Sequence, residues 1–237
     1  MRSPSPTPGA RWHWPALTFA LAVILCGCAS SASSGNGVAS KAPAQIVAAA
    51  KSAAEGAATV HVAGSILGDG TPIAIDMELV SGKGGQGRIV VEGQTVKLVN
   101  VDNAVYLNSG AAFYARFTGA AAARRLQGKW LKASAGGAAL GPLVSLTNLG
   151  KLLGGALSAH GPLSRGVPTS VRGQKAIAVT DLARGGTLFV ASTGAPYPLE
   201  IVKPAPGGGE LEFDRWNQPV ALEPPAGAIN IKQLQSR

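Results

Sequence analysis

The chain has 237 residues, of which 46% are hydrophobic, 14% charged and 5% aromatic. This apolar fraction excludes an intrinsically disordered protein, and the length suits one domain with its own core. The 32 glycines and 16 prolines are spread along the chain and favour many turns over long helices. The net charge of +9 suits an anionic surface, but no basic run is interleaved with aromatic residues, so nucleic acid is not an expected partner.

The N-terminus has the pattern of an export signal. A basic segment precedes the apolar run of residues 16–26, which is too short for a bilayer core that requires about 20 residues. The run ends in Leu25-Cys26-Gly27-Cys28, which resembles the bacterial lipobox, in which the last cysteine is diacylated and the chain is cut just before it. The resemblance implies a lipoprotein signal peptide over residues 1–27 and a diacylglycerol-modified Cys28, with palmitate as a typical acyl chain.

This interpretation also accounts for both cysteines. Cys26 leaves with the signal peptide and Cys28 carries lipid, so the mature chain has no free thiol and no disulfide, which excludes thiol catalysis and thiolate metal sites. Two acyl chains give a durable hold on a membrane, so we expect a lipid-anchored protein on the extracytoplasmic face of the cell membrane. Residues 28–39 are predicted to be the lipidated cysteine and a flexible tether, and residues 40–237 a single folded domain.

The folded region is predicted to begin with an amphipathic helix at 40–56, with Pro43 in its first turn. Period-two alternation then predicts short antiparallel strands, with a hairpin turn at 68–70. The segment 82–87 matches GxGxxG but leads into a strand and not a helix, so it is interpreted as a flexible hairpin loop. Strands are expected over 59–66, 73–79, 88–92, 95–101, 104–108, 161–172, 175–181, 187–192, 198–203 and 210–216.

Helical spacing lies between the two groups of strands. Phe113 and Phe117 lie four apart and Gly119 interrupts the pattern, which predicts two short helices within 111–126. Leucines spaced three and four apart predict another helix near 143–153, and the proline-rich C-terminal end is expected to be an extended arm. Because the helices are grouped, the pattern predicts an α+β fold, with a single strongly curved antiparallel sheet and short helices on its concave side.

The order of these features resembles a known family. The likeness is carried by the lipobox, the tether, the Ala-rich helix, residues 94–99, 102–107, 110–114 and 128–131, and the close Leu222-Glu223-Pro224-Pro225. It resembles the actinobacterial LppX/LprAFG lipoproteins over nearly all of residues 40–235. The resemblance implies a half-barrel related to the LolA/LolB carriers, which holds an acylated lipid or lipoglycan in an apolar cavity and carries or presents it within the envelope.

Enzyme signatures are missing from the sequence. It contains no HExxH, GxSxG or P-loop, so neither catalysis nor a cofactor or metal is predicted. A hydrolase built from His160, Asp181 and Ser158 or Ser164 remains an alternative. His61 is interpreted as a polar-face residue, and so are the carboxylate pairs Asp76/Glu78, Glu210/Glu212 and Glu212/Asp214.

The apolar faces of the strands form either a packed core or the wall of a cavity. The residues alone favour a packed core, which would suit a non-catalytic structural or adaptor lipoprotein, whereas the resemblance favours a lipid cavity. An envelope transporter is a candidate partner. Trp130 is placed at the mouth of the cavity because it combines an apolar ring with an N–H. The predicted lipid-cavity residues are Val62, Ile66, Ile73, Ile75, Met77, Leu79, Val105, Leu107, Trp130, Leu143, Leu146, Leu149, Leu188, Val190, Leu199, Ile201, Leu211 and Phe213.

Overall fold

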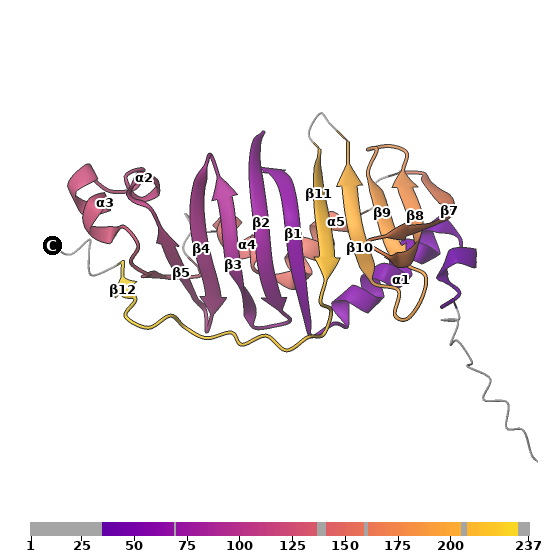
Figure 1. Cartoon of the computed structure of the whole chain (residues 1–237), viewed down its shortest axis with the longest axis horizontal. Coiled ribbons are helices and arrows are strands. Elements are labelled where there is room, and N and C mark those ends of the chain that lie inside the picture. Colours follow the sequence, from indigo (N-terminus) through magenta and orange to yellow (C-terminus); the bar gives the residue numbers. More distant parts are fainter. Residues whose placement is uncertain (1–34, 69, 137–140, 159–160, 205–207, 232–237) are drawn as a thin grey trace, which may run out of the picture. The chain divides into compact units, whose positions relative to one another are not determined.

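The computed structural model describes residues 35–231, except 69, 137–140, 159–160 and 205–207. They belong to one compact unit, Ser33–Arg237. Its described part holds a single twelve-stranded sheet in the order β12-β6-β5-β4-β3-β2-β1-β11-β10-β9-β8-β7 (Figure 1). Neighbouring strands are antiparallel except β12, which runs parallel to β6. The sheet is open, because β12 and β7 each have only one neighbour.

The strands follow one another along the chain as hairpins. Two neighbouring pairs are exceptions, β1 with β11 and β6 with β12, because their strands are far apart in sequence, and α2 and α3 lie between β5 and β6. The bounds are β1 (Thr59–Gly68), β2 (Thr71–Val80), β3 (Gly84–Val91), β4 (Gln94–Val101), β5 (Ala104–Ser109), β6 (Leu131–Ser134), β7 (Leu163–Val171), β8 (Gln174–Asp181), β9 (Thr187–Ala191), β10 (Pro198–Lys203), β11 (Gly209–Asp214) and β12 (Ile229–Asn230).

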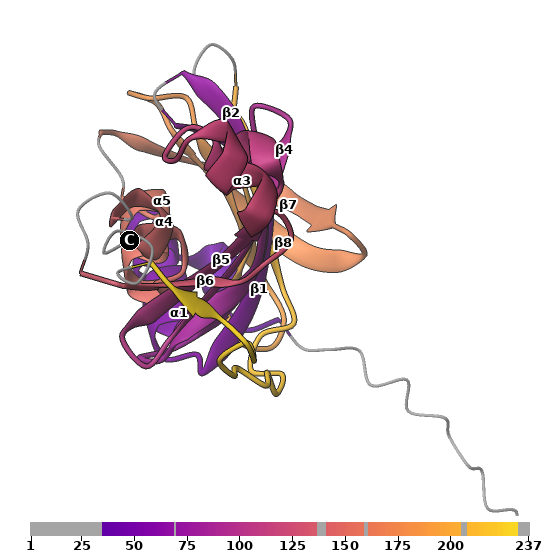
Figure 2. The same cartoon turned by 90° about the vertical axis from the view of Figure 1, so that its left-hand side faces the viewer.

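Short helices lie on the concave side of the sheet and beside its β5 end, as the end-on view shows (Figure 2). Within α1, Pro43 occupies the first turn as predicted, and Asn148 caps α5 by accepting the Lys151 N–H at 2.9 Å. Helix α1 packs against β7–β10 and against α5. The bounds are η1 (Val38–Ser40), α1 (Pro43–Glu55), α2 (Ala111–Tyr114), α3 (Ala120–Leu126), α4 (Gly141–Leu146) and α5 (Leu149–Ala156).

The fold class predicted from the sequence is confirmed. Among the described residues the sheet is one large, open and mostly antiparallel sheet, with five short α-helices and a half-barrel curvature. All ten predicted strands are present, with adjusted ends. The sequence analysis missed two, β6 and β12, because a four-residue and a two-residue strand carry too little alternation to recognise. The extended arm is also confirmed, up to the short pairing of Ile229 with Leu131.

The glycine-rich segment 82–87 was expected to be a loop, and this was wrong for its second half. Gly84 to Gly87 belong to β3, whose backbone pairs with β2 and β4. The missing side chains explain why: a Cβ on Gly87 would lie 2.8 Å from the Met77 sulfur, and one on Gly85 would lie 2.6 Å from a Leu79 methyl carbon. Glycines at these positions therefore leave room for the large side chains of the neighbouring strand β2.

The folded part also begins earlier than predicted. The tether was expected to reach residue 39, but Val38 is only 1% exposed and belongs to the core. Gly35 pairs with Thr193, and the Asn36 side chain donates to the carbonyls of Ala191 and Gly194. A lone valine in a Ser/Gly/Ala tract gave no periodic signal, so the packing of this segment could not be read from the sequence. The predicted signal peptide, the predicted lipidation site Cys28 and the rest of the predicted tether lie outside the described residues.

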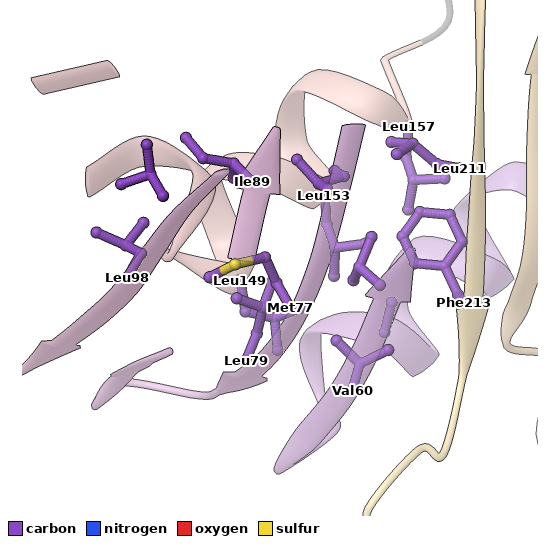
Figure 3. Close-up of a cluster of buried hydrophobic side chains, with 14 of the residues drawn as sticks. Val60, Met77, Leu79, Ile89, Leu98, Leu149, Leu153, Leu157, Leu211 and Phe213 are labelled. Atoms are coloured by element: carbon purple, nitrogen blue, oxygen red, sulfur yellow. The ribbon is translucent and has the colours of Figure 1, made fainter. Parts of the chain in front are cut away.

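The core lies between the concave face and the helices. Leucine side chains of α5 pack against side chains from β2, β3, β4 and β11 (Figure 3). At the β2–β5 end this space is filled, because the side chains that meet there are almost completely buried. They include Met77, Leu79, Ile89, Val96, Leu98, Val105 and Leu153, each at most 1% exposed. This half of the concave face is packed like an ordinary protein interior.

Candidate functional site

A pocket of about 330 Å³ lies at the other half of the concave face, towards β8–β11. Its floor is formed by the inward-facing side chains of Val179, Leu188, Ile201 and Leu211. The rest of its lining comes from the end of α5, from α1 and from the ends of β1 and β7. These further apolar lining residues are Val47, Ile66, Leu67, Leu157 and Leu163. The pocket is therefore predominantly apolar, as sites for small apolar ligands are.

The hollow lies between the end of α5 and helix α1, which packs against β7–β10. Helix α5 ends at Ala156, so its leucines reach across β2, β4 and β11 but not across β8–β10. Four lining positions, Gly155, Gly186, Gly208 and Gly209, contribute no side-chain volume. The adjacent face of α1 buries mainly small residues, Ala50 and Ala54. Short side chains and a short helix thus leave space that longer ones would fill.

The mouth lies at what we call the upper edge, the sheet edge at which β1, β3, β5, β8 and β10 end (top of Figure 1). Arg184 in the β8–β9 turn and Lys203 at the end of β10 line the pocket there, and both are exposed. In the described part of the chain neither forms an ion pair. Asp181 is also at the mouth and accepts the backbone N–H groups of Ala183 and Arg184 at 2.9 and 3.1 Å. The mouth therefore offers two cations and one carboxylate beside an apolar interior.

Most of the predicted cavity residues do face the concave side. Ile66, Leu188, Ile201 and Leu211 line the pocket itself. Twelve others lie in or against the concave core without lining the pocket: Val62, Ile73, Ile75, Met77, Leu79, Val105, Leu107, Leu143, Leu146, Leu149, Val190 and Phe213. The cavity is thus far smaller than the predicted set, because α4 and α5 fill the space above the β2–β5 half.

Two predicted cavity residues lie elsewhere. Trp130 packs with Val99 and Tyr106 on the convex face and borders a polar hollow there, not the mouth of the apolar pocket. Leu199 was assigned to the concave face from simple alternation. A register shift between Pro198 and Glu200 breaks that alternation, so Leu199 packs with Val171 on the convex side.

Several pocket residues were missed by the sequence analysis. Val47, Leu157 and Leu163 come from three separate segments that meet only in the folded chain. Val179 lies on a strand that the alternation identified, and its inward position could have been found from Ile177 two residues before it. The cations Arg184 and Lys203 carry no local signal, since their role depends on the neighbouring turns.

The convex face carries a charged network, which confirms that His61 and the carboxylate pairs lie on a polar face. The His61 ring lies between two carboxylates, with Nδ1 2.6 Å from Asp214 Oδ1 and Nε2 2.9 Å from Asp76 Oδ1. Arg88 also pairs with Asp76 at 2.9 Å. The hydrogen bond from His61, with the charges of His61 and Arg88, holds the pKa of Asp76 below its usual value, against a smaller opposing effect of burial.

A second group on the convex face is centred on Arg172. Its guanidinium lies 3.5 Å from Glu200 and 3.3 Å from Glu212. Burial, followed by the charge of Glu210, raises the pKa of Glu200 in spite of Arg172. Each of these carboxylates is matched by a cation or lies on the surface, which is the pattern of a solvated sheet face and not of an acid–base pair.

Three other features were sought among the described residues: a metal site, the alternative hydrolase site and a membrane-spanning helix. Residues 35–231, with the gaps given above, contain no cluster of three or more His, Cys, Asp or Glu side chains placed to hold a metal. His160, the histidine of the alternative hydrolase, lies outside the described residues. In the part that the structure describes, no helix combines the length and apolar character needed to span a bilayer.

The fold defines a class: an open, curved antiparallel sheet with helices in its concave side and an apolar pocket between the two. Solved structures that share this fold include two mycobacterial proteins. LprF from Mycobacterium bovis superposes with a TM-score of 0.56 at 15% identity, covering 78% of this chain and 97% of its own. The lipoprotein LppX from Mycobacterium tuberculosis gives a TM-score of 0.50 at 17% identity, covering 76% of this chain and 98% of its own.

The predicted resemblance to LppX and LprF is thereby confirmed at the level of the fold. Models of known protein families give no match to this chain, and neither do curated protein sequences. The likeness is thus one of architecture, and the function has to be argued from the pocket.

Proposed function

We propose that this chain is a membrane-anchored lipoprotein of the cell envelope that binds an acylated lipid through one acyl chain. The observation that carries the proposal is the pocket of about 330 Å³, with apolar walls and, at its mouth, Arg184 and Lys203, which form no ion pair with any residue that the structure describes. The fold shared with LprF and the lipoprotein LppX supports it.

The size of the pocket limits the ligand. Sites for small molecules range over roughly 300–1,000 Å³, so this pocket is at the small end. That volume favours one acyl chain in the interior, with any second chain or glycan left outside. Each buried methylene contributes about 0.8 kcal/mol, and roughly ten of them give a gross gain near 8 kcal/mol, which matches micromolar affinity before the costs of binding are counted.

The mouth favours an anionic head group. Arg184 and Lys203 lie where the polar end of an acyl chain would emerge, and both lack a carboxylate partner in the described part. A fatty acid carboxylate or a lipid phosphate would supply the missing negative charge. No chemical step is needed, so the proposal is a binding protein and not an enzyme.

Titration of residues 33–237 with hexadecanoic acid, followed by native mass spectrometry, tests the binding proposal. This unit contains all twelve strands and the whole described core, so it is the appropriate folded part. We expect one ligand per chain, and weaker binding of hexadecanol, which has the same chain with an uncharged head group. Absence of binding for both compounds would overturn the proposal. Equal binding of the two would overturn only the role of the cations.

The anchor is a separate part of the proposal. It rests on the lipobox-like Leu25-Cys26-Gly27-Cys28 and places the protein on the extracytoplasmic face of the membrane, where an envelope transporter is a candidate partner. Metabolic labelling of the full chain with palmitate should mark the protein, and Cys28→Ser should abolish the label. A labelled Cys28→Ser variant would contradict lipidation at this position.

The packed half of the concave face supports a second candidate, a structural or adaptor lipoprotein. The space above β2–β5 is filled by α4 and α5, which a large lipid cavity would not allow. In that case the pocket would be a packing defect without a ligand. The same titration separates the two functions, because an adaptor should take up neither compound.

A further inference from the structure

Exposed apolar side chains lie at intervals along the upper edge. The described residues include four exposed large hydrophobic side chains: Leu67, Phe117, Val167 and Leu182. Leu67 is next to the end of β1, and Leu182 follows the end of β8. Phe117 follows α2, and its neighbour Arg116 pairs with Glu92 in the β3–β4 turn. Three of the four therefore lie along one edge, and only Val167, in the middle of β7, does not.

Their exposure is large for such side chains. Phe117 is 69% exposed and Leu182 63%, whereas Leu67 is 37% exposed and also lines the pocket mouth. The Phe117 ring rests on Phe113, with ring centroids 5.5 Å apart, so its position is supported from below while its far side faces solvent. They are spaced along the edge as single side chains, with three strands between the β5 end and Leu67 and three strands between Leu67 and the β8 end.

Cations accompany these apolar side chains. Arg184 and Lys203 lie at the pocket end of the upper edge. A second group lies around the end of α3 and consists of Arg124, Arg125 and Lys129. This group is also at the upper edge, because the Gly128 N–H donates to the carbonyl of Ser109 at the end of β5. All five are exposed, and within the described residues none forms an ion pair. Of the acidic residues there, Glu92 is matched by Arg116, and Asp181 accepts the N–H groups of its own turn. Glu210, near the start of β11, is exposed at the same edge, so cations outnumber carboxylates there without excluding them.

We propose that the upper edge docks on an anionic phospholipid bilayer, inserting Leu67, Phe117 and Leu182 among the head groups and acyl boundary. Apolar side chains combined with unpaired cations are the features that bind peripheral proteins to such surfaces. The pocket mouth opens at the same edge, so docking would place it against the source of its ligand. Gly35, the first described residue, pairs with Thr193 at the opposite edge.

Co-sedimentation of residues 33–237 with phosphatidylcholine vesicles, with and without phosphatidylglycerol, tests the proposal. The wild type should bind the anionic vesicles, and added salt should weaken the binding. The triple variant Leu67→Ser/Phe117→Ser/Leu182→Ser should lower the partition coefficient at least tenfold. Val167→Ser is the control, because it removes a still more exposed hydrophobic side chain from another part of the sheet, and it should bind like the wild type.

A charge variant and a folding control complete the test. Arg184→Gln/Lys203→Gln should weaken binding to anionic vesicles several-fold and leave binding to neutral ones unchanged. Unaltered melting curves would show that each variant is folded. The proposal is overturned if the wild type stays in solution with anionic vesicles, or if the triple variant binds them as well as the wild type does. The assay needs no ligand in the pocket, so its failure is distinguishable from failure of fatty acid binding.

Discussion

The side chains of Asn100 and Thr147 join the sheet to the helical layer. The Asn100 amide in β4 donates to Thr147 Oγ1 at 2.8 Å, and the same hydroxyl donates to the Val144 carbonyl. Thr147 lies between α4 and α5 and is fully buried. This polar contact within an apolar layer fixes where the two helices sit on the packed half of the concave face.

Removing one partner of this pair should cost more than removing both. Thr147→Val leaves the Asn100 amide without its acceptor, which should lower the free energy of unfolding by about 1–3 kcal/mol. Asn100→Val/Thr147→Val replaces both groups by apolar ones and should recover most of that loss. Urea denaturation measures both values. A double variant less stable than Thr147→Val would contradict the pairing.

Filling the pocket should block ligand binding without unfolding the domain. Ile201→Trp puts a large ring into open space, so we expect hexadecanoic acid binding to fall at least tenfold while the melting temperature changes little. Val202→Trp is the matched control, because the next residue on β10 faces the opposite side of the sheet, and its binding should stay intact.

The same substitution in the packed half should behave differently. Val105 is completely buried, so Val105→Trp has no space to enter and should unfold the domain. Circular dichroism on both variants makes the comparison. Equal stability of Ile201→Trp and Val105→Trp would contradict the division of the concave face into a hollow and a packed half.

The Asp76 carboxylate should make stability depend on acid pH. Its pKa in the folded protein is below the ordinary value of 3.8, so its contribution is complete above about pH 4 and is lost as the pH falls through the folded pKa. Asp76→Asn should lower the free energy of unfolding at neutral pH by about 0.5–1 kcal/mol, a modest value because the side chain is half exposed. It should also flatten the loss of stability below pH 4.

Asp102→Asn serves as the control for this titration. Asp102 is an exposed turn residue with no ion pair among the described residues, so Asp102→Asn should leave the free energy of unfolding at neutral pH close to that of the wild type. Urea denaturation between pH 2 and 7 measures all three proteins. An unchanged acid slope in Asp76→Asn would show that the network around His61 does not stabilise the fold.

Two glycine-to-alanine substitutions should act in opposite directions. A Cβ on Gly87 would lie 2.2 Å from the Asp76 carbonyl, at a φ of 152°, so Gly87→Ala should destabilise the domain by roughly 2 kcal/mol or more. Gly154 lies within α5, and no other atom lies within 4 Å of a Cβ added there. Gly154→Ala should therefore stabilise the domain by about 0.5–1 kcal/mol. Thermal melts that shift in the same direction for both would contradict these backbone roles.

Much of the fold could be predicted from local patterns. Alternation in residues such as Ile75, Met77 and Leu79 identifies the strand and its buried face together, because a sheet with one covered face imposes a period of two. The break at Gly119 likewise separates α2 from α3, since this residue caps the second helix. Signals confined to one element thus gave both its type and its orientation.

The pocket could not be predicted in the same way. Whether the concave side is filled depends on where α5 ends and on glycines such as Gly186 and Gly209, which come from distant parts of the chain. Leu199 shows the same limit, since one extra residue in β10 turns it to the other face. Periodicity identifies which side chains point inward, but the volume they enclose is set by the layers that pack against them.

The account depends on an acyl chain lying in the hollow half of the concave face. A crystal structure of residues 33–237 grown with hexadecanoic acid that carries bromine on its terminal carbon tests this directly. Anomalous scattering should place the bromine inside the pocket, near Ile201 and Leu211, with the carboxylate close to Arg184 and Lys203. A bromine peak outside the pocket, or an empty pocket in crystals grown with saturating ligand, would contradict the account.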